Sequence, residues 1–199
     1  MDKSVISLRE EFPGSWADEL TVHAEQRLRE AEHLYGERDR AWTFIGVQVG
    51  SFEKNVTWPI DKKRKLACIC LQQLPPGYAW PDFLHFNLAH ETIHLLSPPD
   101  ADQVTYLEEG VAVSFSLSRT YANHNYLGEQ VKIFEENPSD KYTVAWKDVD
   151  QLVRADPDAI KKLRLQNQSL SAISAAQIVD AVPGIEVAVA ERLIRKFPV

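Results

Sequence analysis

The pentapeptide His90-Glu91-Thr92-Ile93-His94 constrains this chain more than any other feature of its sequence. Residues four apart on a helix project from the same face, so both imidazoles can reach one metal ion. Glu91 follows His90 at about 100° around the helix, which places its carboxylate beside that ion. Apolar neighbours predict a buried helix, and buried imidazoles need partners, which a metal supplies. The alternative is a helix whose two histidines are ordinary core residues.

A catalytic zinc site with three protein ligands requires one more donor. Two candidates, Glu108 and Glu109, follow a turn-forming segment, Ser97-Pro98-Pro99-Asp100, that allows a second helix to begin beside the first. An acidic residue at the start of a helix also complements the helix dipole, so either glutamate could have that role alone. The residues themselves leave the choice open.

The pentad and the segment that follows it resemble the gluzincins, the zinc peptidase clan of thermolysin and the alanyl aminopeptidases. Beyond the pentad, the matching residues are Leu107, Glu109, Gly110 and Ala112. In that clan the Glu before the Gly is the third ligand, so the resemblance implies a zinc site of His90, His94 and Glu109. It covers residues 16–122 and implies an α+β, zincin-like fold, in which a small mixed or antiparallel sheet packs on an active-site helix and a ligand helix.

The sequence also departs from the clan. The Gly-x-Met-x-Asn motif of the aminopeptidases and the Asn-Ala-x-Trp motif of thermolysin are absent. Thermolysin-like proteins orient a histidine with an Asp four residues after the ligand Glu, and that position here is Val113. The group that orients a ligand must therefore come from elsewhere, with Asn87 or a backbone carbonyl as candidates.

The predicted chemistry is zinc-dependent hydrolysis of peptide bonds in a peptide or protein substrate, which makes the chain a candidate metallopeptidase. A zinc-bound water would attack a carbonyl, with Glu91 as the general base. Candidates for the donor that stabilises the oxyanion are Tyr121, His124 and Tyr126, with Arg119 behind them. The alternative function is a non-catalytic zincin-like module that binds a protein partner. Glu91 favours the enzyme, because a purely structural metal site does not need it.

Charge and hydropathy argue against nucleic-acid binding and membrane association, and they lead to an expected cellular compartment. The formal net charge of −7 argues against nucleic-acid binding, which normally needs a basic excess. The sequence begins without a visible signal peptide and has no apolar run of membrane-spanning length, so we expect a cytoplasmic protein without a membrane partner. The two cysteines, Cys68 and Cys70, would point to one face of a strand as reduced core thiols. Zinc binding by this pair is a weaker alternative.

Hydrophobic periodicity predicts the elements around the site. We expect a helix over 16–36 that is N-capped by Ser15, a strand over 41–52 and a second strand over 65–72. The second strand is either an interior strand or the strand with which an extended peptide pairs. The basic run Lys62–Lys65 before it reads as a solvated turn. Helices over 83–96 and 105–121 then carry the metal ligands.

The last third of the sequence predicts a helical extension. We divide the chain into a zincin-like domain, 1–140, and a helical C-terminal subdomain or extension, 141–199, because turn residues precede position 141. A short helix is expected within 127–137, and Asp156-Pro157 predicts the start of a helix that ends near Gln166.

A capping box, Ser174 to Gln177, predicts another helix, and a last helix should end near Lys196. The segment 178–193 resembles one helix-hairpin-helix, a unit that binds the DNA backbone. Glu186, however, places a negative charge where a phosphate would lie. We therefore predict that these helices pack against the rest of the chain rather than against DNA.

Overall fold

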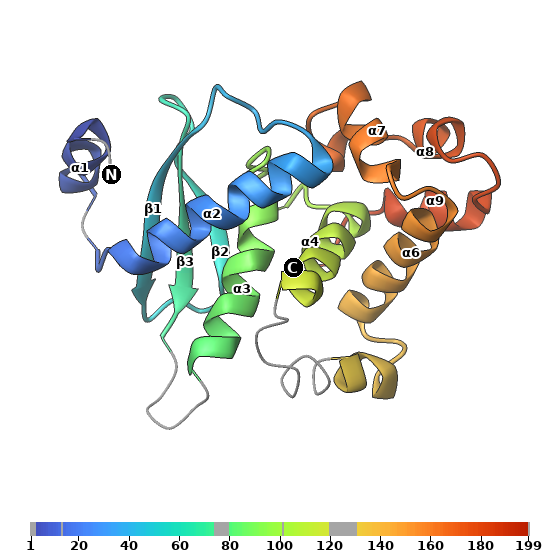
Figure 1. Cartoon of the computed structure of the whole chain (residues 1–199), viewed down its shortest axis with the longest axis horizontal. Coiled ribbons are helices and arrows are strands. Elements are labelled where there is room, and N and C mark those ends of the chain that lie inside the picture. The colour runs from blue at the N-terminus through green and yellow to red at the C-terminus, as the bar shows by residue number, and fades with distance from the viewer. Residues whose placement is uncertain (1–2, 13, 74–79, 101, 120–130, 199) are drawn as a thin grey trace.

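Helices and one small sheet form a mixed α+β fold in the computed structural model, which describes residues 3–12, 14–73, 80–100, 102–119 and 131–198. Residues 131–136 are also helical. The labelled elements (Figure 1) are α1 (Lys3–Glu10), α2 (Asp18–Tyr35), β1 (Thr43–Gly50), β2 (Val56–Asp61), β3 (Leu66–Gln72), α3 (Trp80–His94), α4 (Tyr106–Arg119), α6 (Lys141–Ala155), α7 (Ala159–Gln166), η1 (Leu170–Ala172), α8 (Ala175–Ala181) and α9 (Val187–Leu193).

The sheet has the strand order β1-β3-β2, in which β1 is parallel and β2 antiparallel to β3. Both edges of β3 are therefore paired. Of the two predictions for residues 65–72, the interior strand is confirmed and the peptide-pairing strand is wrong. The strand β2 was not predicted, because it contains Pro59 and lies in a segment with polar residues on both sides. An edge strand tolerates proline, since one side of its backbone needs no partner.

The two faces of the sheet are covered by different helices. Ala67, Ile69 and Leu71 of β3 belong to a large hydrophobic cluster that includes buried residues of α2 and α3. Figure 1 shows these two helices side by side across that face. Cys68 and Cys70 lie on the opposite face, in a cluster with residues of α1. Both thiols are free and buried, with their sulfurs 3.8 Å apart, so the prediction of two core thiols on one face is confirmed.

The helix predicted over 16–36 is present as α2, but the predicted N-cap, Ser15, is wrong. Ser15 does not cap the helix, because its carbonyl oxygen accepts a hydrogen bond from Val49 N at 3.1 Å. The amide of Ala17 donates in turn to Val47 O at 2.8 Å, so the chain before α2 is bound along β1. The helix therefore begins only at Asp18, and its N-cap residue, Ala17, offers no side-chain hydrogen bond.

Helix α6 occupies a segment in which the sequence predicted only turns and a domain boundary. Asp140, one of the expected turn residues, is its N-cap and accepts hydrogen bonds from the amides of Tyr142 and Thr143. The expected start of a helix at Asp156 is also wrong, because the Asp156 amide donates to Leu152 O and ends α6. Helix α7 begins at Ala159 instead. The capping box of Ser174 and Gln177 is confirmed at the start of α8.

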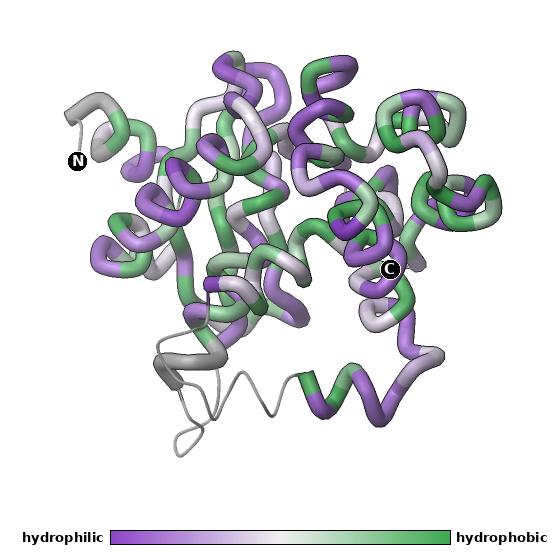
Figure 2. The backbone as a smooth tube through the Cα atoms, turned by 45° about the vertical axis from the view of Figure 1, so that its right-hand side comes forward, coloured by the Kyte–Doolittle hydropathy of each residue, from purple (hydrophilic) through white to green (hydrophobic). Residues whose placement is uncertain are grey.

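The C-terminal helices pack on α4 and on the N-terminal half of the chain. One hydrophobic cluster contains residues from both sides of position 140, while the division of the chain at that position stays a prediction. Hydrophobic and hydrophilic segments alternate along the helices (Figure 2), as expected where one helix face is buried. Within the described part of the chain, no helix combines the length and apolarity needed to cross a membrane.

A buried arginine, Arg164 of α7, fastens these helices to the ends of α2 and α3. Its guanidinium donates to the carbonyl oxygens of Gly36 at 2.7 Å, Glu37 at 3.0 Å and Leu96 at 3.3 Å. These carbonyls lie beyond the last turns of the two helices, where no intrahelical donor remains. The contacts fix the C-terminal end of α3, which carries the predicted metal ligands.

Candidate metal centre

Helix α3 places both predicted histidine ligands on one face. His90 and His94 lie one turn apart, with ring centroids separated by 5.3 Å. Their side chains are almost fully buried, with 12% and 7% of their surface exposed. Apolar residues on the remaining faces of α3, such as Leu88, Ala89 and Ile93, pack into the main cluster. The hydrophobic pattern that predicted a buried helix thus also fixes where the imidazoles point.

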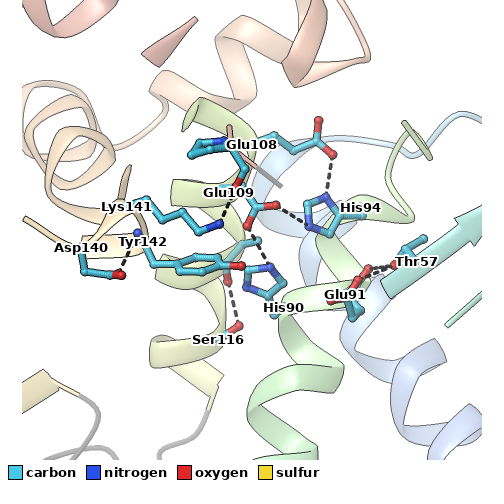
Figure 3. Close-up of polar contacts among 12 residues, drawn as sticks. Thr57, His90, Glu91, His94, Glu108, Glu109, Ser116, Asp140, Lys141 and Tyr142 are labelled. Atoms are coloured by element: carbon cyan, nitrogen blue, oxygen red, sulfur yellow. Dashed lines mark hydrogen bonds and ion pairs between the residues drawn. The ribbon is translucent and has the colours of Figure 1, made fainter. Parts of the chain in front are cut away.

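Helix α4 brings Glu109 to both imidazoles. Its Oε2 lies 3.2 Å from His90 Nε2, and its Oε1 lies 3.7 Å from His94 Nε2. One potential ligand atom from each residue lies within 4.8 Å of the others. Figure 3 shows the carboxylate between the two rings.

One oxygen of Glu109 lacks a hydrogen bond from the residues that the structure describes, and this is compatible with a metal ion at the site. Among the described residues, no donor makes a hydrogen bond to the buried Glu109 Oε2 with acceptable geometry. His90 Nε2 lies 3.2 Å from this oxygen but outside hydrogen-bond geometry. A buried carboxylate oxygen without a hydrogen-bond donor is costly, and a cation bound between the three side chains would reduce that cost. The group His90, His94 and Glu109 could therefore hold a metal ion.

The sequence allowed Glu108 to be only a charge that complements the dipole of α4, but the structure gives this residue a specific contact. It is 3% exposed, and its Oε1 lies 2.7 Å from His94 Nδ1. The two neighbouring glutamates therefore contact opposite nitrogens of the same ring. His94 presents Nδ1 to Glu108 and Nε2 to Glu109.

In the metal-free protein, a positive charge on His94 lies beside the negative charges of Glu108 and Glu109. Burial by itself would lower the pKa of His94, but the hydrogen bond with Glu108 and the negative charges of Glu109, Glu108 and Glu91 outweigh burial and raise this pKa to about 10. Burial would raise the pKa of Glu109, but the adjacent His90, His94 and Lys141 lower it. An imidazolium and a carboxylate thus neutralise one another. A metal ion that binds here must displace the imidazolium proton.

Glu91 lies beside the three-residue group and is oriented by the edge strand. The Thr57 hydroxyl of β2 lies 2.6 Å from the backbone oxygen of Glu91 and 3.1 Å from its Oε2. The hydroxyl has one proton, so it satisfies one of these oxygens at a time. Thr57 was missed by the sequence analysis, because nothing in the sequence around it marks a contact with a helix more than thirty residues away.

Tyr142 of α6 is the second residue that the sequence analysis missed. Its ring lies against His90, with centroids 6.3 Å apart, and its hydroxyl end points toward the histidines (Figure 3). Burial, followed by the negative charges of Glu109, Glu91 and Asp140, raises the pKa of Tyr142 to about 12. The phenol therefore keeps its proton at neutral pH and remains a hydrogen-bond donor. The only available signal was Asp140 as an N-cap, which would have predicted α6.

A pocket of about 170 Å³ opens onto these groups and is lined by His90, Glu91, His94, Glu109 and Tyr142 among others. Phe197 and Pro198 form part of its wall, because the C-terminal segment returns to the site. The Phe197 amide donates to Val104 O at 2.8 Å, and its ring packs on Tyr142 with centroids 4.8 Å apart.

The other predicted site residues lie elsewhere or outside the described ranges. Tyr121, His124 and Tyr126 fall within 120–130, which the structure does not describe. Arg119 forms an ion pair with Glu30 of α2 at 3.4 Å and lies over the Phe115 ring. Asn87 lines a second pocket beside Glu91.

No protein-family model, curated protein or solved structure matches the chain. The geometry of the site brings together the three residues that the sequence singled out as metal ligands, with Glu91 beside them.

Proposed function

We propose that the chain is a zinc-dependent hydrolase that cleaves peptide bonds. The observation that carries the proposal is the convergence of His90, His94 and Glu109, whose ligand atoms lie within 4.8 Å of one another. Two imidazoles and one carboxylate are the donor set of many catalytic zinc sites, which keep a fourth position open. Glu91 supports catalysis over a structural role, since it adds a base that a closed metal site does not use.

The gluzincin resemblance supplies the type of peptidase. Two features of the fold agree with it: a helix that carries both histidines, and a following helix that carries the third donor just before a glycine. A small mixed sheet packs beside them, as a zincin-like fold requires. We propose this classification on the order and placement of the ligands.

Bound zinc would supply Lewis acidity, which acidifies water and polarises a carbonyl group. Glu91 would accept the proton of the attacking water on its carboxylate and then deliver it to the leaving amine. Thr57, at 3.1 Å from Glu91 Oε2, would hold that carboxylate in place. Tyr142 would donate its phenolic proton in a hydrogen bond to the carbonyl oxygen as negative charge develops there.

The cleft supports an extended substrate. A second pocket adjoins the first, and the two share Lys54, Asn55, His90, Glu91 and Tyr142. Space therefore extends on both sides of the proposed base, so residues on both sides of a scissile bond can be accommodated. This arrangement favours an extended peptide over a small-molecule substrate.

The proposal is tested by digestion of a quenched-fluorescence peptide pool with the zinc-loaded protein. Wild type should cleave members of the pool, whereas Glu91→Gln should lose about a hundredfold or more in rate, the scale of a lost general base. Glu19→Gln, an exposed substitution in the first turn of α2, should leave the rate unchanged. Zinc content should be equal in all three proteins. Equal cleavage by wild type and Glu91→Gln would contradict the proposal.

The alternative, a non-catalytic zincin-like module that binds a protein partner, predicts another pattern. Wild type and Glu91→Gln would then both hold zinc, neither would cleave the pool, and both would bind the partner equally. The position of Glu91, 5% exposed and bound to Thr57 beside an open pocket, favours the enzyme.

A further inference from the structure

Two successive hydrogen bonds, through Glu108, link the C-terminal segment to the candidate metal ligand His94. Ser171, in the short helix η1, places its hydroxyl 2.5 Å from Glu108 Oε2. The amide of Thr105 donates to the same hydroxyl oxygen at 3.1 Å. Because Thr105 occupies an acceptor site on this oxygen, the Ser171 proton is free to point at Glu108. Glu108 in turn accepts a hydrogen bond from His94 Nδ1 at 2.7 Å.

These contacts use both oxygens of the Glu108 carboxylate. One oxygen faces His94 and the other faces Ser171, so the carboxylate has no freedom to turn toward the metal side of the ring. Hydrogen bonding at Nδ1 fixes the tautomer of a metal-binding histidine and leaves the Nε2 lone pair for the metal. In His94, Nε2 is indeed the nitrogen that faces Glu109.

We propose that Ser171 is a positioning residue of the metal centre, which acts by holding Glu108 against His94. The inference rests on the proposed function for the identity of the metal. It makes the segment 169–173 a part of the site, although 63 residues separate Ser171 from Glu108 in the chain. The C-terminal helices thereby gain a role in metal binding.

The surroundings of Ser171 show that its position is built into the fold. Leu170 and Ile173, on either side, are each 4% exposed and belong to the main hydrophobic cluster. Arg164 Nε donates to the carbonyl oxygen of Gln168 at 3.0 Å just before this turn. The hydroxyl is thus held by packed neighbours. A displacement of the C-terminal helices would therefore change the hydrogen bonds that orient His94.

The test compares zinc dissociation constants, measured by competition with a chromophoric chelator, in variants of the full chain. A partner that orients a ligand typically contributes about ten- to a hundredfold to metal affinity. Glu108→Gln should therefore weaken zinc binding about tenfold or more. Ser171→Ala, which leaves Glu108 in place, should weaken it by about three- to tenfold, at the lower end of that range. Ser171→Thr, which keeps the hydroxyl, should restore affinity.

The matched control is Ser169→Ala. Ser169 lies two residues away at the start of the same short helix, and its side chain makes no capping hydrogen bond. It should bind zinc as wild type does. Adding Ser171→Ala to Glu108→Gln should cost no further affinity, because Ser171 acts through Glu108. Additive losses in the double variant would overturn the proposal.

A second readout uses the metal-free protein and does not depend on zinc. In nitrogen-resolved NMR spectra of the histidine rings, the proton on His94 Nδ1 should be protected in wild type and exchange faster in Ser171→Ala. Wild-type zinc affinity and an unchanged His94 signal in Ser171→Ala, with only a lower unfolding temperature, would show a merely structural serine and overturn the proposal. If wild type binds no zinc, the proposed function and the metal role of Ser171 both fail, whereas the His94 signal still decides whether Ser171 orients this ring.

Discussion

Gly110 of α4 lies directly against the backbone of Ala145 in α6: a Cβ atom added to Gly110 would lie 2.3 Å from the Ala145 carbonyl oxygen. The glycine that follows Glu109 in the sequence is thus required for the close approach of two helices. One of these helices carries Glu109 and the other carries Tyr142. The contact sets the distance between the helix of the third metal ligand, Glu109, and the helix of the proposed oxyanion donor, Tyr142.

Gly110→Ala should therefore lower the free energy of unfolding by about 1–3 kcal/mol, the usual cost of overpacking, because backbone atoms of α6 must move. Urea unfolding measures this change. Gly50→Ala is a suitable control, since its added Cβ would meet the Phe52 ring at an ordinary 3.4 Å. Similar stability in the two variants would show that α4 and α6 are not in the close contact described.

Tyr142→Phe should reduce kcat by about a hundredfold, because it removes a donor aimed at the developing oxyanion. Zinc content should not change, since Tyr142 is not a ligand. Tyr106→Phe provides the control. The Tyr106 ring also packs on Phe197, with centroids 5.0 Å apart, but Tyr106 does not line the pocket of about 170 Å³. A kcat for Tyr142→Phe equal to that of Tyr106→Phe would assign the oxyanion to another donor.

The stability of the metal-free protein should depend on pH through His94. Its pKa in the folded state is raised from 6.5 to about 10 by Glu108 and Glu109 against the effect of burial. A raised folded-state pKa stabilises the fold fully below the unfolded value, and this stabilisation disappears as the pH rises through about 10. Urea unfolding at pH 6.5, 8 and 10.5 should show the decline in wild type, and His94→Gln should lack this component. A wild-type curve parallel to that of His94→Gln would contradict the assignment.

Zinc affinity should increase with pH, whereas the contribution of His94 to the stability of the metal-free fold decreases with pH. A bound metal requires neutral His94, so each zinc ion displaces a proton and apparent affinity increases with pH. Calorimetric titration at pH 7 in buffers of different ionisation enthalpy would count the protons released. About one proton or more per zinc is expected, and release of none would show that the His94 imidazolium does not form in the metal-free protein.

The elements that carry the ligands were predictable because local patterns define them. The spacing of His90 and His94, the apolar faces around them and the two prolines after α3 all act within one or two turns. The elements that orient the site were not predictable in the same way. Thr57 lies on an edge strand that contains Pro59 and is flanked by polar residues, and Tyr142 lies on a helix whose N-cap, Asp140, was interpreted as a turn residue.

Contacts between distant segments explain the remaining differences. The role of Glu108 depends on which nitrogen of His94 it meets and on a serine from the C-terminal segment. Likewise, Ser15 has a good N-cap side chain, but its backbone is bound to β1. Tertiary hydrogen bonds of this kind override local preference, and a single sequence carries no signal for them.

The two glutamates should differ in how they affect the metal. Glu109→Ala removes a ligand and should weaken zinc binding more than Glu108→Ala, which removes only the partner of His94 Nδ1. Chelator competition measures both dissociation constants. A larger loss in Glu108→Ala would mean that the carboxylates exchange roles when zinc binds.

The most direct measurement is the position of zinc in crystals of the zinc-loaded protein, found by anomalous scattering at the zinc edge. One peak per chain is predicted, at about 2.0–2.2 Å from His90 Nε2, His94 Nε2 and a carboxylate oxygen of Glu109. The peak should be absent from crystals of His94→Ala grown in the same way. A zinc peak at Cys68 and Cys70, or no peak between His90, His94 and Glu109, would contradict the account.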